Sequence, residues 1–147
     1  MFVGLLELAC PRRPVIMHIR GWGTYSCEAS AIAIRLMQEN AIPTQIHNHC
    51  FTGTIDQVLS GSAAYHRFYF SSSGQNARFY EVQKSAVKWI PADRLLIEID
   101  SPYLRVRSKR DNTTACVVEA ANTVIQARNV TTGDILHTTA ENGLFIL

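Results

Sequence analysis

The sequence has few of the residues that interrupt a fold and little net charge. Its 147 residues include 8 glycines and 5 prolines, without a linker or a low-complexity tract, and the formal net charge is +2. This composition is typical of a single globular domain, which we assign to residues 1–147. The small charge gives no indication of a nucleic-acid partner by itself. No apolar stretch of the sequence is long enough to cross a membrane.

Closely spaced cysteines are also missing. The four cysteines are Cys10, Cys27, Cys50 and Cys116, and none of them form a CxxC pair or a zinc-finger spacing. Scattered cysteines of this kind are typical of reduced, mostly buried thiols in an intracellular protein. The apolar start of the chain lacks a basic region and contains Glu7, so it does not resemble a secretion signal. We therefore expect an intracellular protein, either cytoplasmic or nuclear.

Short apolar runs alternate with helical patterns along the chain. The runs typical of strands are residues 15–18, 44–50, 68–71 and 95–100. Helical patterns lie between them and in the tail, near residues 26–39, 55–60, 79–89, 117–124 and 131–136. Four strand–helix units predict an α/β fold with parallel strands, because right-handed crossovers join such units.

The helical patterns also predict which faces are buried. In the helix after the first strand, four apolar residues recur at the spacing i, i+3, i+4, i+7: Ala29, Ile32, Ala33 and Leu36. In the first tail helix the apolar stripe consists of Val117, Ala120, Ala121 and Val124. We expect both stripes to face the core. The second tail helix is preceded by Thr131 to Asp134, which resemble a capping box.

Polar side chains end three of the four strand runs. His18 ends the first run, His49 lies near the end of the second, and Asp100 ends the fourth, where Pro102 cannot continue a ladder. The carboxyl ends of parallel strands meet at one edge of the sheet. Two imidazoles and a carboxylate at this edge suit a divalent metal, either Zn²⁺ or, with more oxygen ligands, Mg²⁺ or Mn²⁺.

Each of these residues also has an ordinary structural interpretation. A single histidine is commonly a core or surface residue satisfied by a neighbour, and an aspartate before Ser-Pro is good turn chemistry. The shared position of the three side chains favours the metal site. His47 precedes His49 by two residues, so the strand period places it on the same face, one layer deeper. We expect His47 to support the ligands from below or to belong to the buried structure.

Several segments resemble the TatD family of metal-dependent deoxyribonucleases. The most specific are Pro14–Arg20 (PVIMHIR), His49–Gly53 (HCFTG) and Glu98–Leu104 (EIDSPYL), which occur in the family's order and at about its spacing. Ser71–Gly74 and Pro91–Leu96 also match, and the likeness extends over essentially the whole chain. The resemblance implies a (β/α)₈ barrel of the amidohydrolase type, a divalent metal cofactor and DNA as the substrate.

The resemblance also implies roles for the residues at the strand ends. His18 and His49 match the metal ligands of the fifth and sixth barrel strands. Asp100 matches the carboxylate of the eighth strand, which binds metal and is catalytic because it accepts a proton from the attacking water.

Three arginines are further candidates for contact with the substrate. Arg20 matches an arginine just past the fifth-strand ligand, where a guanidinium can hold a phosphate oxygen. Arg105 and Arg107 follow Asp100 directly, and their position suits contact with a DNA backbone. A solvated loop is the other interpretation of these basic residues.

Two segments of the family have no counterpart in this sequence. The family's first strand carries a His-x-His pair and its fourth a glutamate, whereas residues 1–147 match strands five to eight, the C-terminal half of the barrel. Two function classes therefore remain open. One is a nuclease, either as a piece of a longer enzyme or with a barrel assembled from two chains. The other is a catalytically weak or inactive half-barrel that binds nucleic acid or protein. We expect self-association or a partner that completes the barrel.

Overall fold

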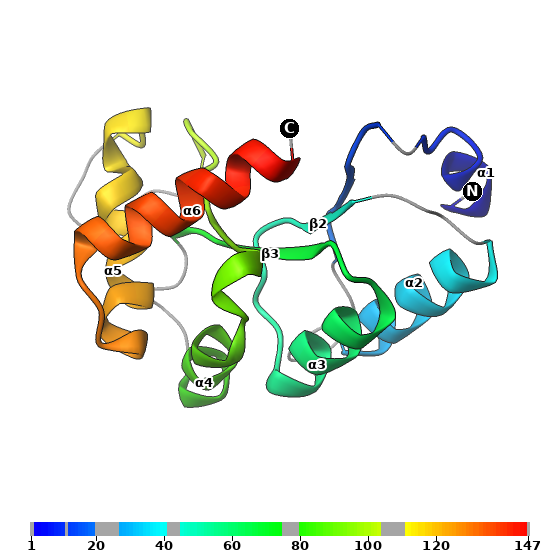
Figure 1. Cartoon of the computed structure of the whole chain (residues 1–147), viewed down its shortest axis with the longest axis horizontal. Helices are drawn as coiled ribbons and strands as arrows, with labels where there is room; N and C mark the ends of the chain where they lie inside the picture. The colour runs from blue at the N-terminus through cyan, green and yellow to red at the C-terminus, as the bar shows by residue number, and fades with distance from the viewer. Residues whose placement is uncertain are drawn as a thin grey trace.

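The structure, a computed structural model, describes residues 2–10, 12–19, 27–40, 45–74, 80–103 and 111–146. The described strands are β1 (Val15–Met17), β2 (Ile46–Asn48), β3 (Phe68–Ser72) and β4 (Leu95–Ile97). The α-helices are α1 (Phe2–Leu6), α2 (Cys27–Glu39), α3 (Ile55–Ala64), α4 (Glu81–Trp89), α5 (Val117–Arg128) and α6 (Thr132–Ile146). The 3₁₀ helices η2 (Ala92–Arg94) and η3 (Thr114–Cys116) precede β4 and α5. Strands and helices thus alternate up to β4, and helices form the tail (Figure 1).

The strands form one parallel sheet in the order β1-β2-β3-β4. Val15 of β1 lies beside Ile46 of β2, which lies beside Phe68 of β3, and Phe70 of β3 lies beside Leu95 of β4. This arrangement confirms the predicted α/β fold with parallel strands. Within the described residues, β1 and β4 are the outer strands and each has a neighbour on one side only.

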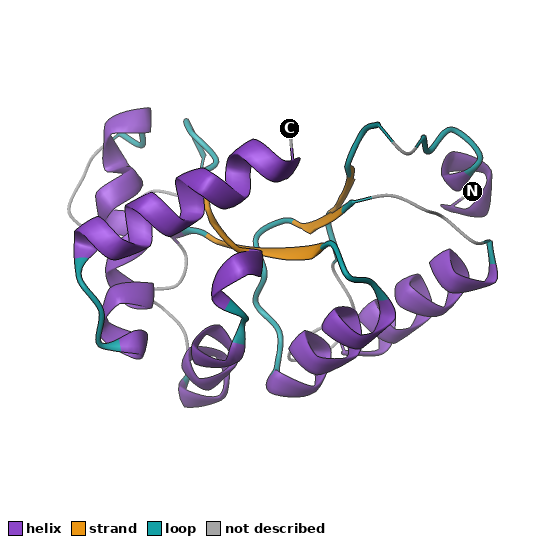
Figure 2. Ribbon diagram, viewed as in Figure 1, coloured by secondary structure: helices purple, strands orange, loops and turns teal. Residues whose placement is uncertain are grey.

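The two faces of the sheet are covered differently. The main core lies between one face and helices α2 to α5. Its buried strand residues are Met17, Ile46, Phe68, Phe70 and Leu95. On the other face, Tyr69 and Leu96 pack with Ile146 at the end of α6. Figure 2 accordingly shows the sheet between α6 on one side and α2, α3 and α4 on the other.

Helix α3 packs closely on β3 because it presents a glycine to it. A Cβ atom at Gly61 would lie 3.0 Å from Cε1 of Phe68 and 3.1 Å from Cζ of Phe70. Carbon atoms in favourable contact are about 3.5–4.0 Å apart. The absence of a side chain at Gly61 therefore sets the distance between this helix and the sheet.

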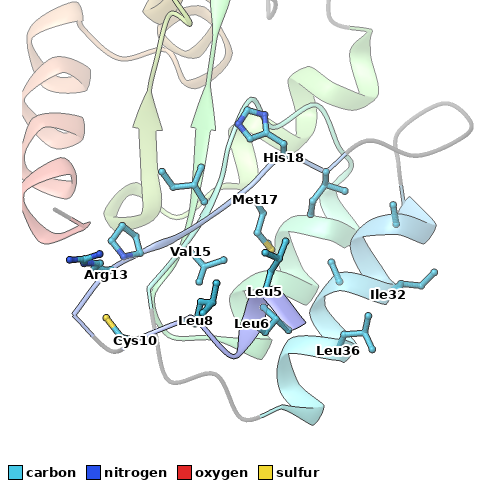
Figure 3. Close-up of a pocket in the computed structure, with 16 residues that line it drawn as sticks. Leu5, Leu6, Leu8, Cys10, Arg13, Val15, Met17, His18, Ile32 and Leu36 are labelled. Carbon is cyan, nitrogen blue, oxygen red and sulfur yellow. The ribbon is translucent and has the colours of Figure 1, made fainter. Parts of the chain in front are cut away.

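The buried face of α2 differs from the predicted one. The buried residues of this helix are Ser30, Ile34 and Met37, whereas Ile32 of the predicted stripe is 43% exposed. The predicted stripe instead lines an apolar groove of about 760 Å³ between α1, β1 and α2 (Figure 3). Both faces of α2 are apolar, and the periodicity identifies apolar faces without telling which one packs on the next helix.

The predictions for the tail helices agree with the structure. Ala120, Ala121 and Val124 of α5 are buried. Before α6, the backbone N–H of Asp134 donates to Oγ1 of Thr131 at 3.1 Å, and the N–H of Thr131 donates to Oδ2 of Asp134 at 3.2 Å. The predicted capping box is therefore confirmed. Among the described helices, none has the length and apolar character needed to cross a bilayer.

Candidate metal centre

The residues that follow β2 and β4 meet across the end of β3. His49 comes directly after β2, and its Nε2 atom lies 2.8 Å from Oδ1 of Asp100 beyond β4. The strand between them ends in Ser71 and Ser72, Ser73 follows it, and all three are small and buried. Because these serines occupy little volume, the longer side chains from the two neighbouring strands reach each other over them.

Glu98 is a member of this group that the sequence analysis did not identify. Its Oε2 atom lies 3.0 Å from Nε2 of His49, so the imidazole sits between two carboxylates. Glu98 precedes Asp100 by two residues, and the strand period that was applied to His47 and His49 applies to this pair as well. One donor atom from each of His49, Cys50, Glu98 and Asp100 lies within 4.8 Å of all the others.

His47 of β2 lies next to this group. Its Nε2 atom is 3.6 Å from Oε2 of Glu98, and its ring meets that of His49 edge-on with a centroid distance of 5.5 Å. Burial and the neighbouring rings of His49 and His18 lower the pKa of His47 to about 4, while the Asp100 carboxylate acts in the opposite direction. His47 is therefore neutral at pH 7, and its supporting role remains a prediction.

His18 lies beside the group without belonging to its four closest donors. Its ring centroid is 4.1 Å from that of His49, and its side chain is exposed. The structure thus brings His18 next to His49, and its role as a ligand remains a prediction. The predicted substrate contacts Arg20, Arg105 and Arg107 lie outside the described residues.

Cys50 joins the ends of β2, β3 and β4. Its backbone N–H donates to Oγ of Ser71 at 3.1 Å and to Oε1 of Glu98. Its thiol donates to Oδ2 of Asp100, with a sulfur–oxygen distance of 2.8 Å. Burial raises the pKa of the Cys50 thiol, and the hydrogen bond to Asp100 acts in the same direction. The thiol is therefore protonated at neutral pH and acts as a donor.

The loop that carries Asp100 is held by the segment before η3. Oγ of Ser101 donates to the carbonyl oxygen of Asn112 at 2.8 Å. The Asn112 amide in turn donates to the carbonyl oxygens of Ile99 and Tyr103. These bonds tie the backbone on both sides of Asp100 to one buried residue and so hold the loop from which the carboxylate extends.

The donor set fits a divalent cation. Two carboxylates, those of Glu98 and Asp100, lie within 3.0 Å of one imidazole nitrogen in a partly buried position, where a bound cation would offset the repulsion between two negative charges. Among the described residues, Nε2 of His47 and Nδ1 of His49 are buried polar atoms without a hydrogen-bond partner. Imidazole nitrogen together with carboxylate oxygen is the donor set of many Zn²⁺, Mn²⁺ and Mg²⁺ sites.

The chain is an α/β protein with a parallel sheet and a candidate metal site of histidine and carboxylate side chains at the carboxyl end of that sheet. Within that class, the sequence model of the TatD related DNase family matches residues 1–145. The chain belongs to this family, as its sequence motifs predicted.

The relatives in sequence are named metal-dependent hydrolases. The chain is 32% identical over 133 residues to the uncharacterized metal-dependent hydrolase YcfH of Escherichia coli (strain K12), an alignment that covers 88% of the chain and 47% of the relative. It is also 32% identical over 136 residues to the uncharacterized metal-dependent hydrolase YabD of Bacillus subtilis (strain 168), covering 88% and 49%. The chain thus spans about half the length of these relatives.

Solved structures share the fold. An uncharacterized amidohydrolase from Saccharomyces cerevisiae matches with a TM-score of 0.74 at 15% identity, over 99% of this chain and 58% of that one. A hydrolase TatD family protein from Entamoeba histolytica matches with a TM-score of 0.68 at 15% identity, over 98% and 53%. At this level of identity the likeness concerns the fold alone.

Proposed function

We propose that the chain forms part of a metal-dependent hydrolase of the TatD type that cleaves phosphodiester bonds of DNA. The observation that carries this proposal is the imidazole of His49 between the carboxylates of Glu98 and Asp100 at the carboxyl end of a parallel sheet. Membership of the TatD related DNase family and the names of the relatives support the same reaction class.

In this proposal His18, His49 and Asp100 hold the divalent ion, which is Zn²⁺, Mg²⁺ or Mn²⁺. A divalent ion held there would polarise a phosphate oxygen and would lower the pKa of a bound water. The carboxylate of Asp100 accepts the proton of the attacking water. Glu98 adds a second negative charge beside His49, and His47 supports the imidazole from below. Arg20, Arg105 and Arg107 bind phosphate oxygens of the DNA backbone.

We further propose that the four described strands correspond to strands five to eight of a (β/α)₈ barrel. A longer chain, a partner or a second copy then supplies the remaining ligands. The alternative function is a catalytically weak or inactive half-barrel that binds nucleic acid or protein. The apolar groove beside the outer strand β1, with Ile16 57% exposed, favours this alternative because it offers a surface for another chain.

The test is a DNA cleavage assay of the 147-residue chain with Mg²⁺, Mn²⁺ or Zn²⁺ added. We expect cleavage far slower than that of a full-length relative assayed beside it, because this chain supplies only part of the ligand set. We expect Asp100→Asn to lower this cleavage by about 10²-fold or more, because it removes both a ligand and a proton acceptor. Asp93→Asn is the matched control, because Asp93 is exposed and lies before β4 instead of after it. DNA binding without cleavage supports the binding module, and cleavage that is unaffected by Asp100→Asn contradicts the proposed site.

A further inference from the structure

Each carboxylate oxygen of Asp100 has its own partner. Oδ1 lies 2.8 Å from Nε2 of His49, and Oδ2 accepts the thiol of Cys50 at 2.8 Å. A carboxylate held at one oxygen can still rotate about its Cβ–Cγ bond. When both oxygens are held, this rotation is stopped and the oxygen that faces His49 is fixed.

The backbone of Cys50 makes this arrangement possible. Successive residues of an extended strand point to opposite faces, so His49 and Cys50 would diverge if β2 continued. Cys50 instead has a φ of 49°, in the left-handed region. The turn at this residue directs its thiol to the same carboxylate that His49 contacts.

The contacts of the Cys50 backbone place the thiol relative to both carboxylates. Its N–H donates to Glu98 and to Ser71, and Oγ of Ser71 donates to the carbonyl oxygen of Asn48 at 3.3 Å. The residue is 1% exposed, so water does not compete for the thiol. In this arrangement the thiol donates its hydrogen bond to the carboxylate of Asp100.

We propose that Cys50 is a positioning residue of the metal centre, whose thiol holds Oδ2 of Asp100 so that Oδ1 is presented next to His49. This inference rests on the proposed function, because it assigns a purpose to the orientation of a proposed ligand. Groups that orient metal ligands commonly change metal affinity by about 10–100-fold when they are removed.

The first experiment tests the thiol–carboxylate bond in the metal-free protein. The S–H stretching band of Cys50 is isolated as the Raman difference between the wild-type chain and Cys50→Ser in the presence of a chelator. We expect this band at a lower frequency than that of an unbonded thiol, and we expect Asp100→Ala to raise it. The corresponding difference for Cys116→Ser provides the reference, because Cys116 is also buried and its thiol has a longer contact, 3.9 Å to Oγ1 of Thr113. A Cys50 band that Asp100→Ala leaves unchanged overturns the inference.

The second experiment measures the affinity for Mn²⁺ and for Zn²⁺ by isothermal titration. Cys50→Ala removes the donor and is expected to weaken binding by about tenfold or more. Cys50→Ser keeps a donor at the same place and is expected to retain most of the affinity, and Cys116→Ser is expected to bind as the wild type does. Equal loss in Cys50→Ser and Cys50→Ala, or no loss in either, overturns the positioning role.

The two experiments separate this inference from the proposed function. A wild-type chain that binds neither metal contradicts the proposed metal centre, whereas the Raman band still decides whether the thiol holds Asp100. Loading with Co²⁺ tests a third possibility, that the sulfur of Cys50 binds the metal directly. A sulfur-to-cobalt charge-transfer band that disappears in Cys50→Ser would show that Cys50 is itself a ligand, which overturns the positioning role.

Discussion

Cys50 and Asp100 both have left-handed backbone conformations, with φ values of 49° and 48°, and they are joined by the bond between their side chains. For residues other than glycine this conformation costs about 1–2 kcal/mol each. Such strain persists only where the surrounding structure holds the residue, and it is concentrated at functional sites. Here it occurs at the two points where β2 and β4 turn into the loops that carry the candidate ligands.

The first prediction concerns metal binding. We expect the chain to bind Zn²⁺ or Mn²⁺, and we expect His49→Ala to lower the affinity by a factor of about ten or more, because it removes the imidazole that both carboxylates contact. Isothermal titration calorimetry measures both affinities. His66→Ala is the matched control, because His66 is exposed and precedes β3, at the opposite end of the strands. Equal binding by wild type and His49→Ala would place the site elsewhere.

The second prediction concerns stability between pH 4 and pH 6.5. The pKa of His47 is lowered from 6.5 to about 4, chiefly by burial, so in this window the unfolded chain binds a proton that the folded chain does not. The free energy of unfolding therefore rises with pH. The stability that comes from burying neutral His47 is fully present above pH 6.5 and is lost as the pH falls towards 4. At 1.36 kcal/mol per pKa unit, the free energy of unfolding falls by about 3 kcal/mol.

Denaturant unfolding of the metal-free protein at several pH values measures this effect. Other groups titrate in the same range, so the informative quantity is the difference between the wild type and His47→Gln. We expect the wild-type curve to fall more steeply on acidification than the curve of the variant. Parallel curves would show that His47 keeps an ordinary pKa in the folded protein.

The strands and the pairing of His49 with Asp100 could be predicted because both depend on short-range patterns. Apolar runs identify strands, and parallel topology then brings their carboxyl ends together. Glu98 could also have been predicted, because it precedes Asp100 by two residues and the strand period places both on one face. The contribution of Cys50 could not have been predicted, because it depends on a left-handed backbone that the residue type does not indicate.

Burial of the helices was predictable only where a single face is apolar. Helix α5 has one such stripe, and the structure buries Ala120, Ala121 and Val124. Helix α2 has two, and its contacts with α3 select the face of Ile34 and Met37 over that of Ile32. Which of two apolar faces is buried depends on tertiary packing, and a local sequence pattern does not contain that information.

The third prediction compares two glycines within helices. Alanine favours a helix over glycine by about 0.8–1.0 kcal/mol. Nothing lies within 4 Å of a Cβ atom at Gly143 in α6, so Gly143→Ala should stabilise the protein by about that amount. At Gly61 the same atom would meet Phe68 at 3.0 Å, and overpacking of a core costs about 1–3 kcal/mol. Gly61→Ala should therefore destabilise the protein. Thermal melting of both variants measures the sign, and stabilisation by Gly61→Ala would show that α3 can move away from the sheet.

The last prediction concerns association of the chain through its outer strands. Within the described residues, β1 and β4 each pair on one side only, and unpaired strand edges are templates for other chains. Ile16 of β1 is 57% exposed beside an apolar groove. Apolar surface left in water costs about 25 cal/mol per Å², so a few hundred Å² amount to several kcal/mol, a large part of the stability of a domain. We therefore expect the chain of residues 1–147 to self-associate or to melt below about 60 °C.

Size-exclusion chromatography with light scattering, together with thermal melting, measures both properties. Ile16→Lys should shift the chain towards the monomer, because a charge on an outer strand opposes edge pairing. Leu59→Lys is the matched control: Leu59 is 50% exposed on α3, away from the strand edges, and the same charge there should leave the association unchanged. A monodisperse wild-type monomer with a cooperative transition above about 60 °C would show that the open edges are already protected. In that case the groove beside β1 is a stable surface of the folded chain and needs no second chain to cover it.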